Sequence, residues 1–213
     1  MEEPRVTEDV SERLIAAGLR ILGERGAAEL TVRRIAEAAG SSTMAVYSRF
    51  GGRAGVLSAV YRRGFELLRS RLEDAPEPDD ATERIIELGL AYRRFALAGP
   101  ALYAFMFERP LPDFEPAIDL RRDALGSTFP ILVAAVEQAA VHGELPARDP
   151  VRTAYLLWCA MHGLVSIELT HAVRSPMPGW ILDTPQAYEQ VLRDGLRAAL
   201  AGLKARGAGS TQD

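Results

Sequence analysis

Residues 31–57 read TVRRIAEAAGSSTMAVYSRFGGRAGVL, and this stretch decides the fold of the chain. Thr31 is well suited to cap the start of a helix, because its hydroxyl can accept a backbone N–H of the first turn. Apolar residues then recur at helical spacing as far as Gly40, where a left-handed residue ends a helix at little cost. The hydroxyl residues at 41–43 can cap a second helix, and the glycines at 51–52 stop it. The stretch therefore predicts two short helices joined by a tight turn, followed by a third helix.

Two short helices joined by a glycine-containing turn are typical of a helix-turn-helix, whose second helix enters the DNA major groove. That helix begins at Thr43, and its spacing turns Val46 and Phe50 inward while most other side chains face out. The first residues of such a helix reach base edges, so residues 43–45 are expected to read bases. The candidate DNA-binding residues are Arg33, Ser42, Thr43, Met44, Ala45, Tyr47, Ser48, Arg49 and Arg53.

The chemistry of these candidates divides their roles. Tyr47 and Arg53 carry donors suited to phosphate oxygens, which fix the register on DNA without reading its sequence. Arg33 lies in the first turn of the first helix, beside exposed N–H groups that attract phosphate. Thr43 can hydrogen-bond a base, and the apolar residues after it can contact thymine methyl groups. Ser42 can reach bases or phosphates, and helix capping alone is its alternative role.

The pattern T-V-x-x-I-A-x-x-A-G-S-S-x-x-x-V-Y-x-x-F-G-G-R-x-x-V-L resembles the N-terminal signature of the TetR (tetracycline-repressor-like) family of transcriptional regulators. This resemblance covers about residues 10–70. It implies an all-α homodimer with an N-terminal three-helix DNA-binding domain and a C-terminal helical domain for ligand binding and dimerisation. We place these domains at 8–73, with the motif at about 31–50, and at 79–205. Family members typically act as repressors that release a palindromic operator when a ligand binds.

The rest of the chain also reads as helical. Periodicity and capping signals predict about nine helices and no strand. The acidic, proline-containing segment EDAPEPDD at 73–80 is the best domain boundary. The expected helices span 8–25, two segments within 31–50, 52–73, 81–99, a short aromatic segment near 101–110, 114–142, and two further stretches that open with Pro150 and Pro185.

The charge is unevenly distributed along the chain. The formal net charge is −4, which argues against a general nucleic-acid binder. Residues 31–72 nevertheless contain eight arginines and two acids, a net +6, so the remaining residues carry −10. A basic helix-turn-helix on an acidic body is the electrostatic pattern of a specific DNA-binding protein. The alternative is that these arginines form a solvated face with local ion pairs.

Composition fits a cytoplasmic protein, and we expect neither a cofactor nor a metal. The single cysteine, Cys159, excludes an internal disulfide and fits a reducing compartment. The N-terminus is acidic, unlike a signal peptide. Residues 154–173 are apolar enough to suggest a membrane span, but His162, Glu168 and His171 within them argue against it. A buried helix of a dimer core is the preferred interpretation, with no membrane partner.

The segment WCAMHGLV resembles a Trp-x-x-x-His-Gly pattern found in the C-terminal domain of a TetR subgroup. In that family the last two long helices, here about 150–172 and 185–203, build a four-helix dimer interface. Two subunits would then present two recognition helices to half-sites about one DNA turn apart. The partners expected from this resemblance are double-stranded operator DNA and a second copy of the chain.

Aromatic residues are concentrated in the C-terminal part, which favours a small apolar or aromatic effector over a phosphorylated or highly charged one. Methionines there add an adaptable apolar surface. For each residue, simple core packing is the alternative. The effector-binding candidates are Tyr103, Phe107, Phe114, Trp158, Met161 and His162.

Two other classes of function stay open at this point. Cys159 and His162 are three residues apart on one helix, so they could form a nucleophile–base pair or half a metal site of an enzyme, or line a binding site. A structural cysteine and a hydrogen-bonded core histidine are the simpler interpretation, and no phosphate loop or hydrolase motif accompanies them. The helix-turn-helix could also bind a protein partner, which the local basic charge disfavours.

Overall fold

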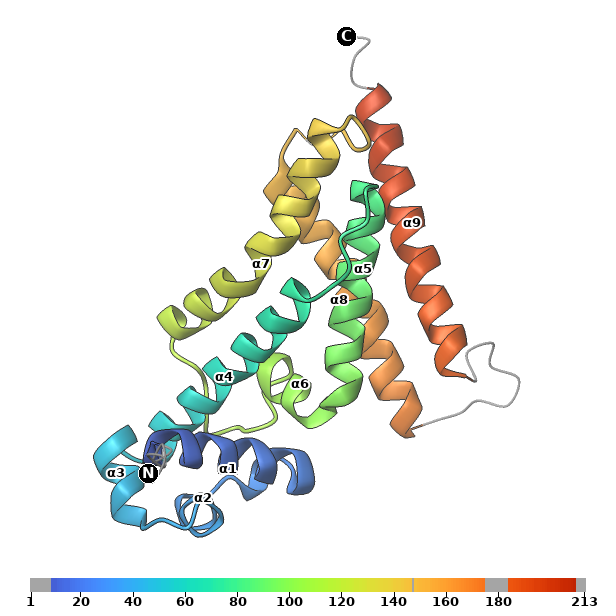
Figure 1. Cartoon of the computed structure of the whole chain (residues 1–213). Coiled ribbons are helices and arrows are strands. Elements are labelled where there is room, and N and C mark those ends of the chain that lie inside the picture. Colours follow the sequence, from blue (N-terminus) through green and yellow to red (C-terminus); the bar gives the residue numbers. More distant parts are fainter. Residues whose placement is uncertain (1–8, 147, 175–183, 210–213) are drawn as a thin grey trace, which may run out of the picture. The chain divides into compact units, whose positions relative to one another are not determined.

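The computed structural model describes residues 9–146, 148–174 and 184–209, and the side chains of 171–174 and 206–209 lie outside the description. The described residues form nine α-helices, one short 3-10 helix and no strand, which confirms the predicted all-α class (Figure 1). The elements are α1 (Val10–Arg25), η1 (Ala27–Glu29), α2 (Val32–Ala38), α3 (Thr43–Phe50), α4 (Arg53–Glu73), α5 (Ala81–Ala98), α6 (Pro100–Phe107), α7 (Ile118–Val141), α8 (Pro150–Arg174) and α9 (Pro185–Gly209).

Side chains cap the starts of six of the nine described α-helices. The Asp80 carboxylate accepts the N–H of Glu83 at 2.9 Å, and the hydroxyl of Thr82 donates to it at 2.6 Å. These hydrogen bonds hold the pKa of Asp80 below its ordinary value, with the Thr82 hydroxyl as the larger cause. Asp149 and Thr184 accept backbone N–H groups in the same way at the starts of α8 and α9. These capping residues therefore lie at the starts of helices in the structure.

Helix α7 begins four residues later than predicted, at Ile118 instead of 114. Pro116 explains the difference, because a proline ring disfavours the helical conformation of the residue before it. By length and composition α7 alone among the described helices could cross a membrane, a test that core helices of soluble proteins also pass. The apolar stretch 154–173 in α8, considered above for the same role, does not meet that test.

Contacts divide the chain into two compact units. The first unit contains the described residues up to Leu67 together with Gly99–Ala124. Within it α1 packs against α2, α3 and α6, around fully buried side chains such as Leu14, Leu22 and Leu57. The second unit contains Leu68–Ala98 and the described residues from Leu125 onward. The domain division proposed from sequence, 8–73 and 79–205, stays a prediction.

The second unit is built on α5, which packs against both α8 and α9, while α8 and α9 also pack against each other. The helices approach closely at Gly89 of α5, where an added Cβ would lie 2.6 Å from the Cδ1 of Leu196. Met161 of α8 lies near the same point, so Gly89 marks the place where the three helices converge. Leu88 of α5 and Leu157 and Val165 of α8 are also buried within this unit.

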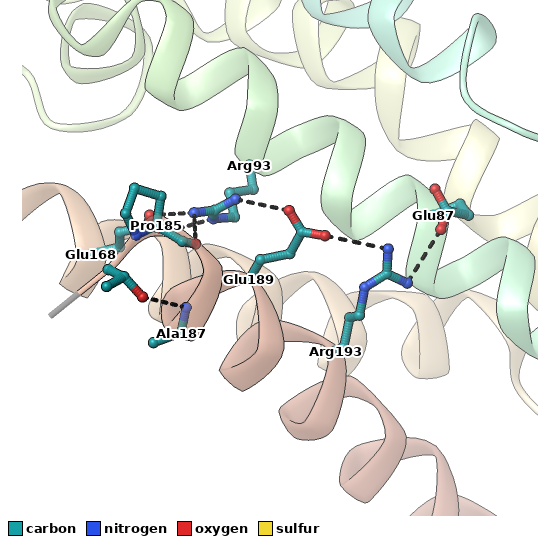
Figure 2. A network of polar contacts seen from close by, with 8 residues as sticks. Glu87, Arg93, Glu168, Pro185, Ala187, Glu189 and Arg193 are labelled. Atoms are coloured by element: carbon teal, nitrogen blue, oxygen red, sulfur yellow. Dashed lines mark hydrogen bonds and ion pairs between the residues drawn. The ribbon is translucent and has the colours of Figure 1, made fainter. Parts of the chain in front are cut away.

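A buried ion pair links these three helices. Arg93 of α5 is 4% exposed, and its guanidinium donates two hydrogen bonds of 2.7 Å to the carboxylate of Glu168 in α8, which is 5% exposed. Figure 2 shows the same guanidinium reaching the carbonyl of Pro185 at 2.8 Å and the carboxylate of Glu189 in α9. Arg193 continues the network from Glu189 back to Glu87 of α5. The network fixes the start of α9 against α5 and α8.

Candidate nucleic-acid interface

The helix-turn-helix is formed by α2 and α3, and each helix begins with a hydroxyl cap. The Thr31 hydroxyl accepts the N–H of Arg34 at 3.3 Å, and the Ser42 hydroxyl accepts the N–H of Ala45 at 3.2 Å. Gly40 lies between them with a φ of 59°, a left-handed conformation that glycine adopts without strain. Gly51 ends α3 in the same way, with a φ of 72°. The local caps and glycines therefore form the predicted turn, and Arg20 of α1 adds a hydrogen bond of 2.6 Å to the carbonyl of Ala38 at the end of α2.

Helix α3 has a buried side and an exposed side. Val46 is fully buried and Phe50 is half-buried, as the spacing predicts. Met44 and Tyr47 are 71% and 54% exposed, which is unusual for large apolar side chains. Thr43, Ser48 and Arg49 are exposed on the same helix, and Ala45 is half-buried. Exposed large apolar side chains on one face of a helix are expected where that face binds another molecule.

The hydroxyls of two candidate residues are used within the helix. Ser42 caps α3, as its alternative role required. The hydroxyl of Ser48 donates to the carbonyl of Ala45 at 3.1 Å. Thr43 and Met44 are therefore the best placed of the candidates to read bases, and the DNA contacts of all nine candidates stay predictions.

Acidic neighbours offset much of the positive charge that the sequence concentrates here. Arg33 lies 2.9 Å from Glu37, both are exposed, and the hydrogen bond to Glu37 raises the pKa of Arg33. Arg34 pairs with Glu29. Arg63 of α4 lies 2.7 Å from two acids, Glu12 of α1 and Glu66 of α4. Local ion pairs, the alternative considered for these arginines, are thus present at several of them.

Arg53 lies at the start of α4 and has two partners in the first unit. Its Nε donates to the carbonyl of Leu30 at 2.7 Å, which ties α4 to the segment before α2. Its Nη1 donates to Asp113 at 2.5 Å, and Asp113 belongs to the loop between α6 and α7. Asp113 was not predicted as a partner of Arg53, because 60 residues separate the two in the chain. A phosphate at Arg53 would have to compete with the Asp113 carboxylate.

The six effector candidates divide between the two units. Tyr103, Phe107 and Phe114 belong to the first, where the rings of Tyr103 and Phe107 are 5.0 Å apart. Phe114 stacks on Phe105, with ring centres 5.6 Å apart and planes 8° from parallel. Tyr103 is fully buried and Phe114 is nearly so, which fits the core-packing alternative for these residues.

The other three candidates belong to the second unit, on α8. His162 Nδ1 lies 2.8 Å from the hydroxyl of Tyr92 in α5, and Trp158 lies against its ring with 5.6 Å between the ring centres. Met161 is buried beside Gly89. Tyr92 and His162 thus place one polar pair among apolar side chains, and Tyr92 was not among the predicted candidates.

Cys159 is exposed, whereas its proposed partner His162 bonds Tyr92. Within the described ranges no group of three or more His, Cys, Asp or Glu side chains could hold a metal ion. The α2–α3 pair with its exposed recognition face and hydroxyl caps instead defines a helix-turn-helix DNA-binding protein.

Comparison with known proteins identifies the family. Residues 14–60 match the family described as bacterial regulatory proteins, tetR family, and residues 85–195, just over half of the chain, match the tetracyclin repressor-like C-terminal domain. The chain therefore belongs to the TetR family and is a transcriptional regulator, not an enzyme. This sets aside the catalytic alternative at Cys159 and His162. The subgroup indicated by the Trp-x-x-x-His-Gly pattern stays a prediction.

Similar proteins agree with this assignment. The chain is 24% identical over 207 residues to the HTH-type transcriptional regulator Rv1816 of Mycobacterium tuberculosis, covering 83% of this chain and 88% of that protein. Its fold resembles a protein of unknown function from Rhodococcus sp. RHA1, with a TM-score of 0.75, 24% identity and 95% and 100% of the two chains covered. It also resembles the transcriptional regulator FadR from Bacillus subtilis, solved in complex with stearoyl-CoA, with a TM-score of 0.69, 16% identity and coverage of 90% and 98%.

Proposed function

We propose that this regulator is a ligand-relieved repressor that binds a palindromic operator as a homodimer in the cytoplasm. The observation that carries the proposal is the exposed face of α3, where Met44 and Tyr47 project from a helix anchored by the buried Val46. In a helix-turn-helix this face meets base edges and phosphates. Family membership implies operator DNA and a small-molecule effector as partners.

The proposed dimer interface uses the helices at about 150–172 and 185–203. Large apolar side chains of α8 are exposed in the single chain, although α8 also packs against α5 and α9. A second copy would cover them and hold two recognition helices about one DNA turn apart. The exposed apolar side chains are Val151, Tyr155, Leu156 and Ile167.

The proposed effector is a small molecule with an apolar or aromatic body. FadR from Bacillus subtilis, which shares the fold, was solved with stearoyl-CoA, a ligand with a long apolar chain. Helix α4 contributes residues to both units, so a shift of its C-terminal end would move its start beside α3. Ligand binding would thereby change the spacing of the two recognition helices and weaken DNA binding, typically by about 1–3 kcal/mol.

The operator is tested by titrating the protein against the DNA upstream of its own gene, at several salt concentrations. We expect a palindromic site bound by one dimer, with an affinity that falls as salt rises because phosphate contacts release counterions. DNA with one half-site scrambled should bind at least about tenfold more weakly at each salt concentration. Equal affinity for the intact and scrambled DNA at every salt concentration would contradict sequence-specific binding.

Asp113→Asn is expected to tighten DNA binding about threefold to tenfold at low salt, because it removes a carboxylate that occupies Arg53. Arg53→Ala should instead weaken binding to all DNA sequences and reduce the salt slope by about one unit. Fluorescence anisotropy with specific and non-specific DNA measures both.

The Arg53 side chain also holds the Leu30 carbonyl, so the free energy of unfolding of Arg53→Ala must be measured alongside its affinity. Arg122→Gln is the matched control, because Arg122 is exposed and pairs with Asp119 on its own helix. If Asp113→Asn leaves DNA affinity unchanged at every salt concentration, Arg53 does not contact phosphate.

A further inference from the structure

A second cluster of charges in the first unit lies around the loop between α6 and α7. Glu115 of this loop pairs with two guanidiniums, those of Arg109 and of Arg121, the latter at 3.3 Å. Arg109 follows α6, and Arg121 belongs to the first turn of α7. One carboxylate thus faces two permanent positive charges, and the cluster has an excess positive charge.

Tyr61 of α4 lies close enough to Arg109 and Arg121 to feel their charges, which makes its hydroxyl a further candidate donor. Its side chain is nearly fully buried, and its hydroxyl makes no hydrogen bond to another described residue. Burial raises the pKa of the Tyr61 phenol, and the guanidiniums of Arg121 and Arg109 partly oppose that rise. The phenol is therefore protonated at neutral pH and has an O–H available to donate.

The donors of the cluster are not satisfied by Glu115 alone. The Nε of Arg121 is buried and has no hydrogen-bond partner among the described residues. A buried donor without a partner carries an energetic penalty that a bound acceptor would remove. Arg109 is also the one described residue other than glycine with a positive φ, 52°, a conformation that is sparsely populated for arginine.

Apolar rings lie next to these donors. Tyr61 packs on Phe65, with 5.1 Å between ring centres, and meets Phe105 edge-on at 6.4 Å. Phe105 in turn stacks on Phe114, the neighbour of Glu115 in sequence. These rings are buried, and oxyanion donors beside a buried aromatic cluster match a molecule with a charged head and an apolar body.

We propose that Arg109, Arg121 and the Tyr61 hydroxyl bind a carboxylate or phosphate group of the effector, and that Glu115 takes the place of this group in the ligand-free protein. The inference rests on the proposed effector response and adds one anionic group to the apolar ligand expected from sequence. Ligand binding would then displace Glu115, which lies two residues from the Asp113 that holds Arg53.

Three probes test separately how the anionic group and the apolar body contribute to binding. They are decanoate, which has both, decanol, which lacks the charge, and pyrophosphate, which lacks the apolar chain. Calorimetric titration of the full-length protein should show tighter binding of decanoate or pyrophosphate than of decanol. Arg121→Gln should weaken binding of the anionic probe about tenfold, whereas Glu115→Gln should strengthen it about tenfold by removing the internal competitor. Binding of decanol should not change in either variant. Arg122→Gln, at the next position of α7, should bind all three probes like the native protein.

The proposal is overturned if neither anion binds to Glu115→Gln, or if Arg121→Gln and Glu115→Gln bind the anions as the native protein does. Glu115 is exposed, so Glu115→Gln should fold normally even where Arg121→Gln does not. The effector response is tested separately by DNA release. An anion that binds through Arg121 without releasing DNA contradicts the proposed function alone, and a ligand that releases DNA equally from native protein and Arg121→Gln contradicts the anion site alone.

Discussion

Arg93→Met is expected to lower the free energy of unfolding by about 3–5 kcal/mol, because it leaves the Glu168 carboxylate buried without its partner. Both side chains are at least nine-tenths buried, so water cannot replace the two hydrogen bonds that are lost. The start of α9 would also lose its attachment at the Pro185 carbonyl. Urea denaturation at a fixed protein concentration measures the change.

Two variants distinguish the buried pair from a general effect of removing arginine. Arg197→Met removes a half-exposed arginine of α9 with partners at 3.6–4.0 Å, and should cost no more than about 1 kcal/mol. The double variant Arg93→Met with Glu168→Leu removes both charges and should recover most of the lost stability. The expectation fails if Arg93→Met costs no more than Arg197→Met.

Local interactions explain why the sequence predicted so much of the fold. Thr31, Ser42 and Asp149 each accept the backbone N–H of the residue three positions further on, so these caps can be predicted from the sequence. Helical periodicity correctly assigned the inward position of Val46 and the exposed face of α3. The apolar pattern predicts an earlier start of α7 than the structure has, because Pro116 disfavours the helical conformation of the residue before it.

The charged interactions could not be predicted, because packing alone brings their members together. Arg93 and Glu168 are 75 residues apart, and Arg53 and Asp113 are 60 residues apart. No acidic residue lies between positions 38 and 65, so the chain alone points to a phosphate and not to a carboxylate as the partner of Arg53. Only the folded loop between α6 and α7 shows that Asp113 pairs with one arginine and Glu115 with two. Tyr92, the partner of His162, was not predicted for the same reason, because 70 residues separate the two in the chain.

Tyr155→Glu is expected to disrupt the proposed homodimer. Tyr155 is 54% exposed on α8 in the single chain, and its ring lies against Trp158 with 5.8 Å between the ring centres. A glutamate there is solvated in the monomer but would be buried without a partner in the dimer. We expect the dimer dissociation constant to rise at least about a hundredfold, which corresponds to about 2.8 kcal/mol. Analytical ultracentrifugation over a concentration series measures this constant.

Loss of the dimer should be seen in DNA binding as well, because a monomer can occupy only one half-site. Affinity for the full palindrome should fall to about that for a single half-site, while the helicity and unfolding of each chain stay intact. Val141→Glu is the matched control, since Val141 is 83% exposed on α7, outside the proposed interface. If Tyr155→Glu remains dimeric and binds the palindrome as Val141→Glu does, the apolar face of α8 does not pair the subunits, and the two recognition helices must be held together by other residues.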